Sequence, residues 1–195
     1  MVFKILAVIV AYLIGSVNNA IIICKLKNVD IKSVGSGNAG ATNTVRALGK
    51  KYGILVFFLD FFKGVIAVVI GNFFDVGCYC AVLSVIGHIF PVYFKFKGGK
   101  GVSTAYGALA VLSVFSALIC GVIILLMIIV VKIVSISSLT SFLLKPFVNI
   151  ALNKFVINDT FICICIISVL VFYSHRSNIS RLIKGNENSF SKKGK

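Results

Sequence analysis

The chain has 195 residues, of which 59% are hydrophobic and 13% charged, and its mean hydropathy is +1.07. Average soluble domains carry about 45–50% apolar and about 25% charged residues, so this composition excludes an ordinary soluble protein. The formal net charge of +15 would suit a nucleic-acid-binding surface. Here, however, the Lys and Arg residues lie between hydrophobic runs, which indicates a membrane protein with no nucleic-acid partner.

Apolar runs bounded by charged or turn residues predict seven transmembrane helices, because each crossing needs about 20 residues. The predicted helices are 3–24, 53–71, 77–94, 102–116, 117–131, 139–153 and 158–174. A single helix from 102 to 131 would be about 45 Å long, too long for one crossing, and we divide it near Ser113 to Ser116. We therefore expect an all-α, polytopic integral membrane protein. Its single membrane domain spans residues 1–195 and ends in a basic cytoplasmic tail over 175–195.

The charge pattern predicts which ends of these helices face the cytoplasm. The first run follows Lys4 as in a signal peptide, but its length and the lack of a small-residue cleavage site predict a retained helix. With seven crossings, almost all basic residues share one face, which predicts an outside N-terminus and a cytoplasmic C-terminus. Six crossings would split them between the faces. The basic residues concerned are Lys25, Lys27, Lys32, Arg46, Lys50, Lys51, Lys95, Lys97, Lys100, Lys132, Arg176, Arg181, Lys184, Lys192, Lys193 and Lys195.

Two kinds of reactive residue lie within the apolar runs. Asp60 and Lys63 are three residues apart in the second predicted helix, where they can pair. Intramembrane charges are functional candidates, although an ion pair that orients helices is the simpler interpretation. The cysteines lack metal-binding spacing and are interpreted as small buried hydrophobic residues. They are Cys24, Cys78, Cys80, Cys120, Cys163 and Cys165.

The loop from Val34 to Arg46 reads VGSGNAGATNTVR. Its glycines allow the backbone to approach an anion closely, its Ser, Thr and Asn side chains are neutral donors, and Arg46 offers a planar fork suited to phosphate. The GxGxxG pattern in it does not follow a strand, so we reject a dinucleotide-binding fold. An ordinary surface turn is the alternative for this loop taken alone.

The segment from Gly87 to Thr104 reads GHIFPVYFKFKGGKGVST. Glycines bracket Lys100 directly before a predicted helix, so the ammonium and the helix N-terminus can converge on one anion. Gly101 follows the lysine where a Walker A loop has Ser or Thr, which argues against a nucleotide triphosphatase. The alternative is a membrane-surface turn with snorkelling lysines.

The tail opens with His175, Asn178 and Arg181 at intervals of three residues. If the last helix continues, they form one polar stripe at the membrane surface. The stripe places a titratable imidazole beside groups that suit phosphate. A lone interfacial histidine is more often structural than catalytic, so its interpretation depends on the other two motifs.

The motifs GSGNAGATNTVR, GHIFPVYFKFKGGKGVST and HRSNISRLIKGNE, in this order among seven hydrophobic runs, closely resemble the acyl-phosphate-dependent glycerol-3-phosphate acyltransferase family of bacteria. The resemblance runs from the first helix to about Glu187. It implies a multi-pass enzyme of the bacterial cytoplasmic membrane with a cytoplasm-facing active site. Such an enzyme transfers a fatty acyl group from acyl phosphate to the 1-hydroxyl of sn-glycerol 3-phosphate, giving lysophosphatidic acid and phosphate. Membrane lipid surrounds it, and no metal or cofactor is implied.

The resemblance also assigns roles to individual residues. The implied catalytic residues are Ser36, Arg46, Lys100, His175 and Asn178. The implied substrate-binding residues are Gly37, Asn38, Thr42, Asn43, Lys97, Gly98, Gly99, Gly101 and Thr104. The chain departs from the family pattern at GSVN (residues 15–18), where GSIP is expected, at GVST instead of GVAT, and at Ser177, which replaces an acidic residue.

Direct attack by the glycerol hydroxyl is the expected mechanism, because no Ser-His-Asp order or HxxxxD pair is evident. Its proton goes either to a substrate phosphate or to His175. The main alternative function is a phosphate or anion transporter or channel, which would usually place its site near the membrane midplane rather than at one interface. A scaffold whose basic face binds anionic lipid would explain the lysines but not the ordered polar set.

Overall fold

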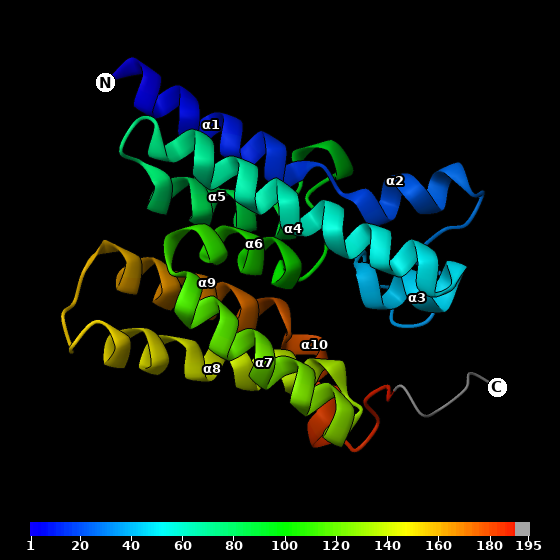
Figure 1. The fold of residues 1–195 in the computed structure, drawn as a ribbon. Coiled ribbons are helices and arrows are strands. Elements are labelled where there is room, and N and C mark those ends of the chain that lie inside the picture. The colour runs from blue at the N-terminus through cyan, green and yellow to red at the C-terminus, as the bar shows by residue number, and fades with distance from the viewer. Residues whose placement is uncertain (190–195) are drawn as a thin grey trace. The chain divides into compact units, whose positions relative to one another are not determined.

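The computed structural model describes residues 1–189, and its regular elements are helices, as the predicted all-α class requires (Figure 1). Lys192, Lys193 and Lys195 of the predicted tail lie outside the described residues. The elements are α1 (Val2–Ser16), α2 (Asn19–Leu26), α3 (Ala41–Leu48), α4 (Lys50–Asn72), α5 (Gly77–Ile89), the 3-10 turn η1 (Val92–Phe94), α6 (Val102–Leu112), α7 (Val114–Val131), α8 (Val134–Leu152), α9 (Asp159–Ser174) and α10 (Arg176–Ile183).

Five segments of the described chain are long and apolar enough to cross a bilayer. They are Val2–Leu26, Lys50–Asn72, Gly77–Phe94, Val114–Val131 and Val134–Leu152. The pair α9 and α10, bent by 58°, makes a sixth if it is counted as one span. Helix α6 is apolar but has only 11 residues, about 16 Å, against a hydrocarbon core of about 30 Å.

The helices form two compact units, Met1–Leu112 and the chain from Ser113 onwards. In the first unit α4 packs against α1, α3, α5 and α6, and α1 also packs along α5. Small residues permit these contacts: a Cβ on Gly64 would lie 2.2 Å from the Thr104 carbonyl oxygen, and one on Gly15 would lie 2.2 Å from that of Ser84. Close backbone approach of this kind is typical of helices packed within a membrane.

In the second unit α8 packs against α7 and α9. Hydrogen bonds join α8 to the segment before it: Asn149 Nδ2 donates to Ser113 Oγ at 2.8 Å, and Ser141 Oγ donates to the Cys120 carbonyl at 3.2 Å. Lys145, one turn from Ser141, is fully buried on the same helix. The packed face of α8 is therefore polar, which suits a membrane protein whose apolar side chains face lipid.

The sequence placed most helices but missed several breaks. The run from 102 to 131 divides at Ser113, inside the predicted interval. The predicted helix 3–24 is broken between Ser16 and Asn19, and the predicted helix 77–94 leaves α-helical geometry after Ile89 because Pro91 cannot continue it. Helices α3 and α10 were not predicted as separate elements, because each has eight residues and no long apolar run. Four cysteines interpreted as buried are buried, namely Cys24, Cys80, Cys120 and Cys163, and Cys78 and Cys165 are partly so.

Candidate active site

Asn43, in the first turn of α3, ties the loop before it into a compact turn. Its side-chain oxygen accepts a hydrogen bond from the Ser36 N–H at 3.0 Å. Its Nδ2 donates to the carbonyl oxygens of Ile31 at 3.0 Å and Val34 at 2.8 Å. The side chain is buried, so these bonds hold the loop from inside. We call residues 34–40 the serine loop.

Gly35 brings Arg46 and the serine loop together. Its φ is +57°, and a Cβ at this position would lie 2.4 Å from Asn43 Oδ1 and 3.0 Å from Arg46 Cδ. Both the backbone conformation and the lack of space require glycine. The stem of Arg46 therefore passes beside Gly35, and Arg46 is exposed while Ser36 is half-buried. These two predicted catalytic residues lie on adjoining segments of one small structure.

The lysine loop, residues 95–101, folds back on the end of α5. The Gly98 N–H donates to the Ile89 carbonyl at 3.2 Å, and the Gly99 N–H donates to the His88 carbonyl at 3.1 Å. A Cβ on Gly98 would lie 2.1 Å from that His88 oxygen, so a larger residue would break the pairing. Lys97 is exposed in this loop.

Lys100 lies directly before the N-terminus of α6, as the sequence predicted. Gly101, at φ +78°, precedes Val102, and its carbonyl accepts the Ala105 N–H at 2.7 Å, the first hydrogen bond of the helix. Lys100 is half-buried beside this helix end. An anion near Lys100 would therefore meet an ammonium and the positive end of the α6 dipole.

The two loops meet at Gly99. A Cβ on this residue would lie 2.5 Å from the carbonyl oxygen of Ala39 and 2.3 Å from Nε2 of His88. Gly99 and Ala39 are both buried. The serine loop and the lysine loop, about 60 positions apart in the sequence, are therefore in backbone contact within the first unit.

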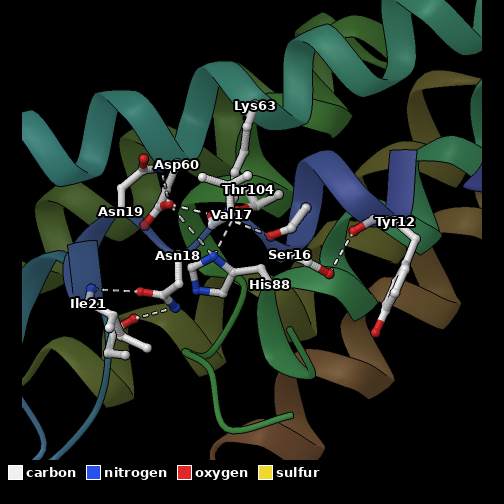
Figure 2. A network of polar contacts seen from close by, with 12 residues as sticks. Tyr12, Ser16, Val17, Asn18, Asn19, Ile21, Asp60, Lys63, His88 and Thr104 are labelled. Atoms are coloured by element: carbon white, nitrogen blue, oxygen red, sulfur yellow. Dashed lines mark hydrogen bonds and ion pairs between the residues drawn. The ribbon is translucent and has the colours of Figure 1, made fainter. Parts of the chain in front are cut away.

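A buried polar network underlies this contact (Figure 2). Thr104, a predicted substrate-binding residue, is fully buried, and its hydroxyl lies 3.3 Å from Nδ1 of His88. Asp60 Oδ1 lies 3.8 Å from the same nitrogen and 3.2 Å from Lys63 Nζ. The structure thus places Thr104 beneath the loops, in contact with His88.

His175 and Asn178 belong to the second unit, where α9 ends and α10 begins. Nδ1 of the buried His175 lies 2.8 Å from the Val171 carbonyl. Because a carbonyl only accepts, this contact makes Nδ1 the protonated nitrogen and Nε2 the basic one in a neutral ring. Asn178 is also buried, and within the described chain its Oδ1 has no hydrogen-bond partner.

Glu187 anchors the segment after α10, and the sequence analysis gave it no role. Its carboxylate accepts hydrogen bonds from Asn178 Nδ2, from Arg181 Nε at 2.8 Å and from Ser135 Oγ at 3.0 Å. Burial raises the pKa of the Glu187 carboxyl, but these hydrogen bonds and the Arg181 charge outweigh burial and hold the pKa below its ordinary value. In the sequence, the only indication of this ion pair was the six-residue spacing between Arg181 and Glu187.

The arrangement suits anion chemistry. Arg46, Lys100 and the helix N-terminus behind it supply positive charge, while the serine loop supplies neutral donors. Within residues 1–189, no group of three or more His, Cys, Asp or Glu residues is placed to hold a metal ion. Of the remaining predicted residues, Gly37 is exposed and Asn38 is partly exposed in the serine loop, and Thr42 is partly exposed on the first turn of α3.

Comparisons with known proteins agree with the family resemblance predicted from the sequence motifs. A family model described as glycerol-3-phosphate acyltransferase matches residues 5–185. The chain is 44% identical to a glycerol-3-phosphate acyltransferase of Aquifex aeolicus, covering 94% of this chain and 97% of that one. A relative of the same name from Thermoanaerobacter sp. is 42% identical, with 98% of each chain covered. A crystal structure of PlsY, described as an integral membrane glycerol 3-phosphate acyltransferase in its glycerol 3-phosphate form, matches with a TM-score of 0.91. That chain is 41% identical, with 96% of each chain covered.

Proposed function

The chain belongs to the glycerol-3-phosphate acyltransferase family, and from this membership we propose that it transfers a fatty acyl group from acyl phosphate to the 1-hydroxyl of sn-glycerol 3-phosphate. The products are lysophosphatidic acid and inorganic phosphate. The observation that carries the proposal in the structure is the contact of the serine loop with the lysine loop at Gly99. This contact gathers Ser36, Arg46 and Lys100 in one unit, within a chain that has the helices of an integral membrane protein.

The reaction brings together two phosphates and a carbonyl oxygen that becomes negative. Arg46 and Lys100 bind the phosphates, and either cation can serve either substrate. The Ser36 hydroxyl and the loop N–H groups donate to the developing oxyanion, and removing one such donor typically costs about 3–4 kcal/mol of transition-state stabilisation. Acyl phosphate is already activated, so positioning and electrostatics suffice for transfer.

The chemical step is a direct displacement. The glycerol 1-hydroxyl oxygen attacks the acyl carbonyl carbon, and the C–O bond to the phosphate leaving group breaks. The hydroxyl proton passes to a substrate phosphate oxygen or to Nε2 of His175, the nitrogen left basic by the contact of Nδ1 with Val171. Asn178 Oδ1, a buried acceptor, is suited to orient a substrate hydroxyl.

The proposed topology has seven crossings, with the N-terminus outside and the C-terminus and active site in the cytoplasm of a bacterial cell. It adds α6 and α9 to the five long spans. The distribution of Lys and Arg supports it, because Arg46, Lys97 and Lys100 fall on the same predicted side as Arg181. Labelling of an introduced cysteine by a membrane-impermeant reagent, in intact cells and in inside-out vesicles, tests this topology. An N-terminal cysteine that is labelled only in the inside-out vesicles would contradict it.

The function is tested with purified protein in lipid vesicles supplied with acyl phosphate and radiolabelled glycerol 3-phosphate. We expect labelled lysophosphatidic acid with acyl phosphate and none with acyl-CoA or acyl carrier protein thioesters. Absence of lysophosphatidic acid, together with phosphate flux into sealed vesicles, would establish the transporter alternative instead.

Matched variants test the assigned roles. Lys100→Gln should lower kcat/KM at least 100-fold, whereas Lys95→Gln, a change of an exposed lysine in the same loop, should alter it less than threefold. His175→Ala distinguishes between the two possible proton acceptors, the His175 imidazole and a substrate phosphate. A loss of turnover that grows from pH 6 to pH 8 supports the imidazole as base, because only the neutral ring can accept the proton, while full turnover across this range assigns the proton to the substrate phosphate.

A further inference from the structure

The apolar run from Val2 to Leu26 is interrupted by a break that has a specific set of partners. Val17 and Asn18 are extended, with ψ values of 108° and 97°, so α1 ends and α2 begins in a new direction (Figure 1). Such a break frees backbone carbonyls, which need partners inside a membrane. Lys63 Nζ supplies them by donating to the Gly15 carbonyl at 2.9 Å and the Val17 carbonyl at 2.6 Å.

Asp60 contacts the α2 side of the break. Its Oδ1 accepts a hydrogen bond at 2.9 Å from Nδ2 of Asn19, the first residue of α2, and lies 3.2 Å from Lys63 Nζ. The Asp60 and Lys63 side chains are only 1% and 7% exposed. The ammonium thus faces the negative end of α1, and the carboxylate lies at the positive end of α2 (Figure 2). The order of the two charges along α4 matches the polarity of the two helix ends.

Asn18 connects the break to the serine loop. Its Oδ1 accepts the Ile21 N–H at 3.0 Å and so caps α2, while its Nδ2 donates to the Ala39 carbonyl at 3.3 Å. That carbonyl is the one against which Gly99 of the lysine loop packs. The break and the contact of the two loops are therefore connected through the side chain of Asn18.

His88 also contacts Gly99. Its Nδ1 lies 3.8 Å from Asp60 Oδ1, and its carbonyl accepts the Gly99 N–H. Gly99 thus contacts both Ala39 and His88. Ala39 is linked to Asp60 through Asn18 and its chain neighbour Asn19, and His88 faces Asp60 directly. An ion pair that only oriented helices would not need these links to the loops.

We propose that Asp60 and Lys63 are positioning residues that fix the α1–α2 break, so that Asn18 holds the serine loop against the lysine loop. The pair acts on the loops through Asn19, Asn18 and Ala39 on one route and through His88 on the other. Its consequence for catalysis rests on the proposed acyl transfer, whereas its consequence for the loops does not.

The test compares hydrogen exchange at residues 34–40 and 95–101 with steady-state kinetics. Asn18→Ser keeps a cap for α2 but is too short to reach Ala39, and Asp60→Asn keeps an acceptor for Asn19 without the charge. Both should speed exchange in the two loops at least tenfold and raise KM for at least one phosphate substrate at least tenfold. The control, Asp75→Asn, removes the exposed Lys4–Asp75 pair of the same unit and should change neither.

A charge exchange, Asp60→Lys with Lys63→Asp, separates positioning from simple pairing. It keeps an ion pair but presents each charge to the wrong helix end, so loop exchange should stay fast. Slow, wild-type loop exchange in this double variant, or in Asn18→Ser and Asp60→Asn, would overturn the proposal. Exchange needs no turnover, so a wild-type protein that makes no lysophosphatidic acid would refute the acyl transfer and leave the positioning result intact.

Discussion

Replacing Asn43 distinguishes a residue that builds the serine loop from one that touches substrate. The family resemblance assigns Asn43 to substrate binding, but its side chain makes three hydrogen bonds inside the loop, to Ser36, Ile31 and Val34. Asn43→Ala removes all three. Asn43→Asp keeps the acceptor for the Ser36 N–H but turns a carboxylate oxygen toward the two carbonyl oxygens.

The magnitude follows from these contacts. A neutral hydrogen bond contributes about 0.5–1.5 kcal/mol net, and an unsatisfied buried group costs about 1–3 kcal/mol. Loss of three bonds at a buried site should therefore destabilise the closed loop by about 3 kcal/mol, which is about a 150-fold shift toward open forms. Asn43→Asp loses two bonds and adds oxygen–oxygen repulsion, so its effect should be at least as large.

Hydrogen exchange and kinetics on the same preparations measure the effect. Both variants should speed exchange of the Ser36 amide about 100-fold or more and lower kcat/KM in parallel. Asn153→Ala is the control, because it removes a comparable side-chain bond at 2.8 Å in the second unit. Lost activity with unchanged exchange at Ser36 would refute the reasoning and make Asn43 a direct substrate contact.

Three further predictions concern single contacts. Gly99→Ala should abolish most activity, because its Cβ would lie 2.5 Å from the Ala39 carbonyl, and a crystal structure of the variant should show the two loops separated. Since the folded pKa of Glu187 is lowered, its stabilisation is complete above the unfolded value of about 4.3 and is lost as the pH falls through the lower folded pKa. In the wild-type protein, proteolysis of the segment after α10 should therefore increase as the pH falls. Glu187→Gln, which has no carboxylate to protonate, should show no such increase. Tyr12→Phe should cost about 1 kcal/mol in a denaturation experiment by deleting the 2.9 Å bond to the Phe90 carbonyl.

Apolar runs predicted the long helices because lipid demands about 20 apolar residues per crossing. The division at Ser113 was predictable from length alone. The start of α8 at Val134 was not, because the segment carries serines at 135, 137 and 138 that resemble a loop. The structure shows these serines buried, two of them bonded: Ser135 to Glu187 and Ser137 to the Ile133 carbonyl.

The sequence likewise predicted part of the candidate site and missed the rest. The glycine, serine and lysine pattern indicated an anion site, since residue type alone carries that chemistry. Which residues face substrate depends on tertiary contacts, and these place Thr104 beneath the loops with His88. The spacing predicted the pairing of Lys63 with Asp60. The other partners of Lys63 are backbone carbonyls, which every residue has, so no sequence pattern could identify them.

The departure from the family pattern at residue 18 gains a physical meaning from these contacts. The expected GSIP would place proline there, which ends a helix because it lacks an N–H and restricts the preceding residue. Asn18 ends α1 by another route: its side chain caps α2 and also donates to the Ala39 carbonyl. Proline can make neither bond. In this chain the break and the serine loop are thus joined by one side chain, so that a change at the break reaches the loop directly.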